Sequence, residues 1–547
     1  MTVNSTLRDA AFRWMADDPD DGSRAELQDV VAKAMGGDAD AANAATELAD
    51  RMAGPLEFGT AGLRGPVRAG PNGMNVAVVT RTTAGVAEWL KAHGHAGALV
   101  VVGRDARHGS EAFATAAAEV LTAAGFDVKV FARPLPTPVL AFAVGRLGAV
   151  AGIQITASHN PPADNGYKLY DATGGQIVPP SDGEIERAIE AAPAAVSVPR
   201  APGAEVADLL DRYLDEVAAL PLGHERAVRV AATALHGVGA DTLRAAFERA
   251  GFTDLHLVDA QATPDPDFPT VSFPNPEEPG ATDLLLALAS DVDADLAIAL
   301  DPDADRCALG VRERDGRWRM LRGDETGVLL GSYVLSTVDR TLLPDPLVAT
   351  TIVSSSMLGE IAKAEGARYA ETLTGFKWLV RAGDGLVFAY EEALGLCVNP
   401  GFVRDKDGIA AATLAAGLAA QLKKRGRTPL DVLDDLAQRH GVHLTDQVSL
   451  RVTDLAVRGQ LMAKVRKTPP SRLGGVEVVL EDLLPDADVV RLTGDGVRVV
   501  VRPSGTEPKL KAYLQVVAPV PDSLTDARGA AQERLTALRA DVEELLA

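Results

Sequence analysis

Short apolar runs and longer amphipathic stretches alternate along most of this 547-residue chain, and this alternation limits the fold more than any other feature. Runs such as 98–102 (ALVVV), 227–233 and 347–352 are typical of buried strands, and each precedes a stretch with helical spacing. Parallel strands need long connections, which are usually helices. The alternation therefore predicts an α/β protein.

The alternation of strand and helix patterns restarts twice, and near residue 443 it gives way to a region in which strand patterns dominate. A stretch rich in Ala, Pro and Val at 191–203 is typical of a linker before the second round. Beyond residue 443, strand patterns dominate, and a last helix is expected near 526–546. We predict three consecutive α/β domains and a smaller C-terminal α+β domain, with boundaries at 1–205, 206–316, 317–441 and 442–547.

Charge and composition exclude several classes of protein. Lys and Arg number 54 against 76 Asp and Glu, so the formal net charge is −22, which repels nucleic acid and anionic lipid. The apolar stretches are too short to span a bilayer, and we expect no secretory signal. The two cysteines, Cys307 and Cys397, are expected to be packing residues in a reducing compartment. We expect a soluble, cytoplasmic monomer or small homo-oligomer with no nucleic-acid or membrane partner.

The first segment with unusual chemistry is ITASHNPPADNGYKLY at 155–170, which is expected to be a loop after a buried strand. Ser158 in such a loop can be a nucleophile or a phosphoryl carrier. A turn stabilised by serine and asparagine side chains would explain the same residues. His159 follows directly, although adjacent side chains usually diverge.

The second segment is DPDADR at 301–306, directly after an apolar run. In an extended loop, the carboxylates of Asp301, Asp303 and Asp305 fall on one side. Clustered carboxylates repel one another unless a hard cation neutralises them, and oxygen ligands without histidine favour Mg²⁺. An EF-hand is excluded because Arg306 and Arg312 occupy the sixth and twelfth positions. The alternative is a solvated acidic turn.

Three further segments carry weaker signals. The paired acids of EEALG (391–395) can accept hydrogen bonds from sugar hydroxyls, or can begin a helix. The segment RPSGTEPK (502–509) can form an anion cradle, or a hairpin turn with polar residues. TLTGFKW (372–378) and FGTAGLRG (58–65) place Lys377 and Arg64 in glycine-containing loops.

Together and in this order, these segments resemble the α-D-phosphohexomutase family, which includes phosphoglucomutases and phosphomannomutases. The resemblance covers nearly the whole chain and includes RDKDG at 404–408. TGFKW and EEALG look most like the branch of phosphoglucomutases and phosphopentomutases. Many members have a serine where this chain has Ala393, and some have a histidine where it has Leu396. The identity of the sugar and of the general base therefore stays open.

The resemblance implies four domains, with mixed sheets in the first three, around a central active-site cleft. It implies that Ser158 carries the phosphoryl group and, with Asp301, Asp303 and Asp305, binds Mg²⁺. The other residues implied in catalysis are Arg64, His159, Lys168 and Arg306. Those implied in substrate binding are Gly375, Lys377, Glu391, Glu392, Arg404, Lys406, Arg502, Ser504, Gly505, Thr506 and Lys509.

The implied reaction interconverts a sugar 1-phosphate and a sugar 6-phosphate through phosphoserine and a sugar bisphosphate. Glucose phosphate is preferred, with mannose and pentose phosphates as alternatives, and glucose 1,6-bisphosphate or the cognate bisphosphate as activator. Two more distant alternatives are a haloacid-dehalogenase-like phosphatase with Asp301 as nucleophile and a non-catalytic sugar-phosphate-binding protein. Neither alternative explains all the segments together.

Overall fold

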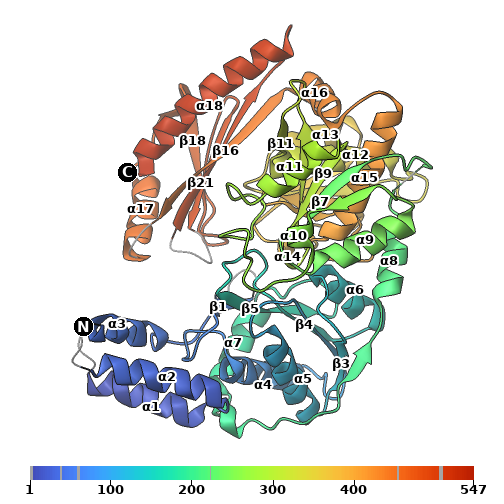
Figure 1. The fold of residues 1–547 in the computed structure, drawn as a ribbon. Helices are drawn as coiled ribbons and strands as arrows, with labels where there is room; N and C mark the ends of the chain where they lie inside the picture. Colours follow the sequence, from blue (N-terminus) through green and yellow to red (C-terminus); the bar gives the residue numbers. More distant parts are fainter. Residues whose placement is uncertain are drawn as a thin grey trace. The chain divides into compact units, whose positions relative to one another are not determined.

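The computed structural model describes residues 4–36, 40–57, 62–221, 223–451, 455–503 and 509–546 (Figure 1). The chain forms two compact units. The first comprises Met1–Gly310 with Asn399–Ala416, and the second comprises Val311–Val398 with Gly417–Ala547. The first unit thus takes most of the first two predicted domains and a short segment of the third.

The first unit begins with three helices that pack side by side (Figure 1): α1 (Ser5–Asp17), α2 (Asp21–Ala34) and α3 (Ala41–Arg51). Asn4 and Asp20 cap α1 and α2, because their side chains accept hydrogen bonds from backbone N–H groups three residues on. Leu27 and Leu48 lie in the small core between the helices.

The first sheet comprises β1 (Leu63–Pro66), β2 (Leu99–Arg104), β3 (Asp127–Phe131), β4 (Ala151–Ile155), β5 (Asp164–Asp171) and β6 (Glu205–Ala207). Its order is β1-β5-β4-β2-β3-β6, and β5 runs antiparallel to both neighbours while the others are parallel. Around it lie α4 (Val76–Ala92), α5 (Ser110–Ala123), α6 (Thr137–Leu147), α7 (Ser181–Ala191) and the short η1 (Ala195–Ser197). The parallel β2 and β4 end at the same edge, which places residues 105–109 beside 156–163.

The second sheet of this unit contains β7 (Val230–Thr233), β8 (Leu255–Leu257), β9 (Leu296–Leu300) and β10 (Cys307–Arg312). β7 is parallel to β8 and β9, whereas β10 returns antiparallel to β9. The accompanying helices are α8 (Leu210–Ala218), α9 (Gly239–Ala250), α10 (Asp259–Ala262) and α11 (Asp283–Asp291). The apolar strand β9 is fully buried and leads directly into DPDADR.

The second unit contains a mixed sheet of order β13-β12-β14-β15, formed by β12 (Leu347–Thr351), β13 (Arg368–Thr372), β14 (Leu386–Glu391) and β15 (Gly395–Cys397). β12 is parallel to β13 and β14, and β15 is antiparallel to β14. Elements near it in the chain are β11 (Trp318–Met320), α12 (Gly323–Thr337), α13 (Met357–Ala364), α14 (Phe376–Leu379), α15 (Gly408–Lys424) and α16 (Pro429–His440).

The C-terminal sheet is antiparallel in the order β16-β21-β20-β19-β18-β17. Its strands are β16 (Val442–Arg451), β17 (Arg472–Leu473), β18 (Val476–Asp482), β19 (Val490–Gly494), β20 (Val497–Pro503) and β21 (Lys509–Ala518). The helices α17 (Leu455–Lys467) and α18 (Leu524–Leu546) accompany it, and α18 lies across β16 and β21 (Figure 1).

The predicted fold class is confirmed: three mixed sheets with helices precede an antiparallel sheet with helices. The prediction that 155–170 is one loop is wrong, because Asp164–Asp171 form β5. Within the described residues, no helix is both long and apolar enough to cross a membrane. Cys307 and Cys397 are buried free thiols, as expected of packing residues.

Candidate functional site

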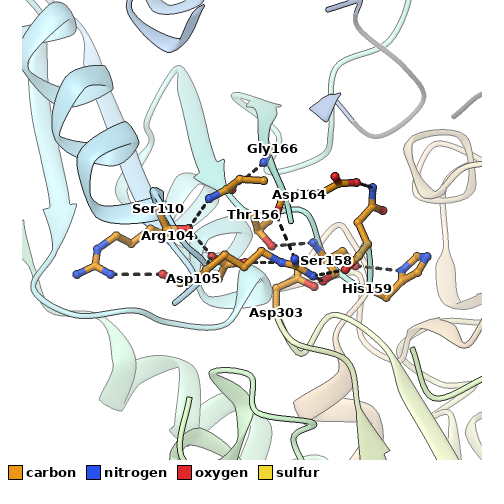
Figure 2. Close-up of polar contacts among 12 residues, drawn as sticks. Arg104, Asp105, Ser110, Thr156, Ser158, His159, Asp164, Gly166 and Asp303 are labelled. Atoms are coloured by element: carbon orange, nitrogen blue, oxygen red, sulfur yellow. Dashed lines mark hydrogen bonds and ion pairs between the residues drawn. The ribbon is translucent and has the colours of Figure 1, made fainter. Parts of the chain in front are cut away.

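Ser158 lies in the tight loop between β4 and β5 (Figure 2). The residue is fully buried and has a positive φ of 51°, which is uncommon for a residue with a side chain. Its backbone N–H donates to Thr156 Oγ1 at 2.9 Å, and its hydroxyl donates to Asp301 Oδ2 at 2.7 Å. A strained backbone thus turns the Ser158 hydroxyl toward the acidic segment of the neighbouring sheet.

The acidic segment is a tight turn that brings three buried carboxylates together. Asp301, Asp303 and Asp305 are fully buried, and one oxygen of each lies within 4.8 Å of the others. The prediction of an extended loop is wrong, because Ala304 has a φ of 54° and its N–H donates to the carbonyl of Asp301. The turn, rather than strand-like alternation, gathers the acids.

Close backbone packing fixes this turn from two sides. Val238 N–H donates to the carbonyl of Pro302 at 2.8 Å, and a Cβ on Gly237 would overlap the backbone of Pro302. On the other side, Gly408 N–H donates to the carbonyl of Ala304 at 3.1 Å, and a Cβ on Gly408 would also overlap backbone carbonyls of the turn.

We expect Gly237→Ala to destabilise the first unit by roughly 1–3 kcal/mol, because the added methyl group meets backbone atoms that cannot move independently. Thermal unfolding should show a lower melting temperature than the wild type. The matched control is Gly145→Ala, since a Cβ at this exposed position in α6 meets no other atom within 4 Å. That change should be neutral or stabilise by up to about 1 kcal/mol. Equal melting temperatures for the two variants would contradict the packing argument.

Cationic groups surround the acidic turn. Lys168 Nζ donates to Asp303 Oδ2 and Asp305 Oδ2, each at 2.7 Å, and Lys406 Nζ lies 3.2 Å from the same oxygen of Asp305. Burial alone would lower the pKa of Lys168, but the charges of Asp303 and Asp305 outweigh burial and raise the pKa. Arg306 donates its backbone N–H to Asp301 Oδ1 at 3.0 Å.

The three carboxylates fit a divalent metal ion. Among the described residues, the buried Oδ1 atoms of Asp303 and Asp305 accept no hydrogen bond. Burial and the neighbouring charges of Asp303 and Asp305 raise the pKa of Asp301 well above its ordinary value. A hard cation would coordinate such oxygens and remove this repulsion, and the all-oxygen donor set, with Ser158 Oγ beside it, suits Mg²⁺.

His159 and Arg64 both contact the Ser158 loop. His159 Nδ1 is 3.4 Å from Ser158 Oγ, so the two adjacent side chains converge rather than diverge. Burial, followed by the positive charges of Arg306 and Arg64, lowers the pKa of His159 well below its ordinary value. This shift favours the neutral imidazole. Arg64 Nη1 donates to Asn160 Oδ1 at 3.0 Å.

The RDKDG segment belongs to the first unit and completes this group of charges. Asp405 accepts hydrogen bonds from Tyr170 at 2.8 Å and Gln176 at 3.0 Å, and Asp407 accepts one from Tyr213 at 2.7 Å. These bonds hold Arg404 and Lys406, which lie on either side of Asp405. The first unit thus brings together the predicted residues Arg64, Ser158, His159, Lys168, Asp301, Asp303, Asp305, Arg306 and Lys406.

Sequence reasoning missed Arg107, which contacts the Ser158 loop directly. Its guanidinium donates to the backbone carbonyl of Ser158 at 2.7 Å and to that of Asn160 at 2.6 Å. Asp105, shown in Figure 2, accepts from the Arg107 N–H at 3.0 Å. One signal could have revealed these residues: the polar run RDARHGS follows a buried strand, as DPDADR does.

In the second unit, the acids of EEALG lie at the hairpin between β14 and β15, not at the start of a helix. Glu391 is the last residue of β14 and pairs with Gly395. Glu392 Oε2 accepts hydrogen bonds from Thr351 Oγ1 at 3.1 Å and Ser354 Oγ at 3.0 Å. Burial, followed by the charges of Glu391 and Asp324, raises the pKa of Glu392 to about 7.

The raised pKa makes Glu392 a source of pH-dependent stability. Its contribution is fully present below the unfolded-state value of 4.5 and is lost as pH rises through about 7. Each unit of pKa difference corresponds to about 1.4 kcal/mol, and partial exposure reduces the total to on the order of 2 kcal/mol. We expect Glu392→Gln to reduce the fall in melting temperature between pH 5 and pH 8 by roughly 4–8 °C.

The exposed Glu365→Gln is the control, and its melting temperature should match that of the wild type at each pH. An identical pH dependence of the melting temperature in all three proteins would contradict the expectation.

The remaining predicted residues lie at the ends of elements in the second unit. Gly375, with a φ of 110°, precedes α14, which carries the buried Lys377. Arg502 lies near the end of β20 opposite Lys511, and Lys509 begins β21 opposite Arg451. The predicted phosphate-binding residues between these strands, Ser504, Gly505 and Thr506, lie outside the described residues.

Comparison with family models gives one consistent result along the chain. Models described as phosphoglucomutase/phosphomannomutase α/β/α domains I, II and III match residues 55–195, 211–316 and 322–440. A model described as the C-terminal domain of the same family matches residues 450–519.

Individual relatives carry the names of different mutases. The chain is 41% identical over 455 residues to a Haemophilus influenzae protein named "Probable phosphomannomutase", covering 81% of this chain and 93% of that protein. It is 33% identical over 539 residues to the phosphopentomutase of Mus musculus, covering 86% of each. A solved phosphoglucomutase/phosphomannomutase family protein from Burkholderia thailandensis has the same fold, with a TM-score of 0.67 at 22% identity over 88% of this chain and 97% of that one.

Proposed function

Because the chain belongs to the phosphoglucomutase/phosphomannomutase family, we propose that it interconverts a sugar 1-phosphate and a sugar 6-phosphate, with glucose phosphate preferred. The observation that carries this proposal is the position of Ser158 Oγ, 2.7 Å from Asp301 in a buried cluster of three carboxylates. A serine hydroxyl beside such a cluster suits a phosphoryl carrier, since phosphoryl transfer needs positioning and charge stabilisation more than covalent machinery.

In the proposed reaction, phosphoserine 158 donates its phosphoryl group to a free hydroxyl of the sugar phosphate. The bond between phosphorus and Ser158 Oγ breaks, a bond to the sugar oxygen forms, and the hydroxyl proton leaves to a base. The sugar bisphosphate then turns around, and its other phosphoryl group returns to Ser158. The net result moves the phosphate between C1 and C6, and a trace of glucose 1,6-bisphosphate primes the unphosphorylated serine.

The surroundings of Ser158 support distinct roles for two neighbours. His159 Nδ1 lies 3.4 Å from the hydroxyl and its neutral form is favoured, so it is positioned to accept a proton. Lys168 is held charged by two aspartates, which favours a fixed positive charge over proton transfer. With Arg64 and Arg306, Lys168 would attract the transferring phosphoryl group.

We assign Mg²⁺ to Asp301, Asp303, Asp305 and the oxygen on Ser158. When bound, Mg²⁺ would supply positive charge that stabilises the transferring phosphoryl group. Arg306 and Lys406 would then be available to bind phosphate oxygens, because Mg²⁺ rather than these two residues would balance the negative charge of the carboxylates. This assignment rests on the buried carboxylate oxygens that accept no hydrogen bond among the described residues.

The remaining predicted residues are assigned to the substrate by the family motifs they match. Glu391 and Glu392 would accept hydrogen bonds from sugar hydroxyls, and Gly375 and Lys377 would border the sugar phosphate. Arg404 would approach the reacting end. The distal phosphate would be held by Arg502, Ser504, Gly505, Thr506 and Lys509.

The experiment is an assay of the purified protein with Mg²⁺, a trace of the matching bisphosphate and one of three substrates. Glucose 1-phosphate, mannose 1-phosphate and ribose 1-phosphate are compared side by side, and we expect the highest kcat/KM for glucose 1-phosphate. A clear preference for mannose or ribose phosphate would change the proposed substrate but would leave the proposed mutase reaction unchanged. Release of inorganic phosphate without a mutase product would favour the phosphatase alternative instead.

A further inference from the structure

Arg107 binds the Ser158 loop through four hydrogen bonds, yet it is not one of the residues assigned above. Its side chain is 1% exposed. One terminal nitrogen donates to the carbonyls of Ser158 and Asn160, and the other donates to those of Pro161 at 2.8 Å and Asp164 at 3.1 Å. A single guanidinium therefore binds four carbonyls between the end of β4 and the start of β5.

A second layer of contacts holds Arg107 itself. Asp105 Oδ1 accepts from the Arg107 N–H at 3.0 Å and from Ser110 Oγ at 2.6 Å, while Asp105 Oδ2 lies 3.6 Å from Arg107 Nε. Asn165 donates to Ser110 Oγ at 2.9 Å and accepts from the N–H of Gly166, so the network reaches β5 (Figure 2). The ring of Phe268 covers the guanidinium at 4.9 Å.

We infer that Arg107 is the positioning residue of the phosphoryl carrier: it holds the Ser158 loop in the strained conformation that directs the hydroxyl at the acidic turn. This inference rests on the proposed function. Ser158 has a φ of 51°, a conformation that persists only when the surroundings impose it. Hydrogen bonds to four carbonyls of one short loop provide that restraint.

The geometry requires arginine rather than any cation. A guanidinium offers five donors in a rigid plane and can bind several carbonyls at once, whereas a lysine ammonium is a compact charge on a flexible chain. Arg107 contacts the backbone of the loop, so its loss should reduce the rate of the chemical step more than the affinity for substrate. A misplacement of about 1 Å at a reacting group can cost about 100-fold in rate.

Arg226 provides a matched control in the same unit. It too donates to backbone carbonyls, including those of Ala250 at 2.6 Å and Glu225 at 2.8 Å, and it too lies over an aromatic ring, that of Phe252, at 5.1 Å. Its contacts lie far from Ser158 in the sequence and include none of the assigned site residues. Arg107→Gln and Arg226→Gln therefore make the same chemical change at arginines that both bind backbone carbonyls and lie over an aromatic ring, although Arg226 is less buried.

The test compares kcat and KM of the wild type, Arg107→Gln, Arg107→Lys and Arg226→Gln, together with hydrogen exchange of the peptide covering 156–166. We expect kcat of Arg107→Gln to fall about 100-fold with KM changed less than about threefold, and its loop amides to exchange faster. Arg107→Lys should show an intermediate kcat, and added methylguanidinium should raise the turnover of Arg107→Gln. Arg226→Gln should match the wild type in kcat, KM and loop exchange.

Two outcomes would overturn the inference: wild-type kcat in folded Arg107→Gln, or unchanged exchange of its Ser158 loop. If Arg107→Gln does not fold, Arg107→Lys tests the inference instead. Wild-type turnover and loop exchange in Arg107→Lys would show that the planar guanidinium is not required. Absence of turnover in the wild type with all three sugar phosphates would instead defeat the proposed function. The exchange measurement still tests the restraint on the loop in that case.

Discussion

Ser158→Ala should abolish turnover, with a loss on the order of 10⁴-fold or more, because it deletes the atom that carries the phosphoryl group in the proposed reaction. The substitution removes one buried hydroxyl, whose hydrogen bond in the structure goes to Asp301 Oδ2. Folding should change little, since alanine keeps the Cβ and the backbone conformation. The measurement is turnover of glucose 1-phosphate, with mass spectrometry of the peptide that contains residue 158.

Ser332→Ala is the matched control. Its hydroxyl donates to the carbonyl of Leu329 within α12, so the variant loses a hydroxyl that has no part in the assigned site. Phosphate should be found on Ser158 in the wild type and in Ser332→Ala. Normal turnover in Ser158→Ala, or phosphate on Asp301 instead, would replace the mutase mechanism by one with an aspartyl nucleophile.

The residues around Ser158 show what a sequence can predict about such a site. Ser158 and the three aspartates belong to short motifs directly after buried strands, and the carboxyl ends of strands in open α/β sheets are where ligands bind. Their meeting at 2.7 Å is a long-range contact, and the resemblance to a family, not the spacing, predicted it. Arg107 follows a strand in the same way, but its partners are backbone carbonyls about fifty residues away, which leave no trace in residue types.

The fold was predicted with similar limits. The buried apolar strand β12 was predicted nearly to the residue, since the run 347–352 corresponds to Leu347–Thr351 and full burial gives a continuous apolar run. β5 was missed, since DNGYKLYD carries turn residues and three charged residues. It is a strand because it pairs with β1 and β4 and buries Tyr167 in the hydrophobic core and Lys168 beside the acidic turn. The acidic turn was expected to be extended, because a left-handed alanine is not visible in a sequence.

Asp303→Asn should reduce turnover at least about 10³-fold and weaken Mg²⁺ binding, because it removes one of three charges from the assigned metal site. Asp303 Oδ2 also accepts hydrogen bonds from Thr137 at 2.6 Å and from Lys168. An amide keeps a carbonyl acceptor for one of these donors, but it no longer balances the charge of Lys168. We therefore expect a modest decrease in melting temperature beside the large loss of activity.

The two effects are separated by a control at the other end of the same strand. Asp295 precedes β9 and accepts the backbone N–H of Arg229 at 2.7 Å, so Asp295→Asn also neutralises an aspartate next to β9 but leaves the acidic turn intact. Calorimetric titration with Mg²⁺ should show wild-type affinity in Asp295→Asn and at least about tenfold weaker binding in Asp303→Asn.

Because the acids repel one another without a cation, chelation with EDTA should lower the melting temperature of the wild type more than that of Asp303→Asn. Full activity and unchanged Mg²⁺ affinity in Asp303→Asn would remove the acidic turn from the mechanism, whatever the melting temperature.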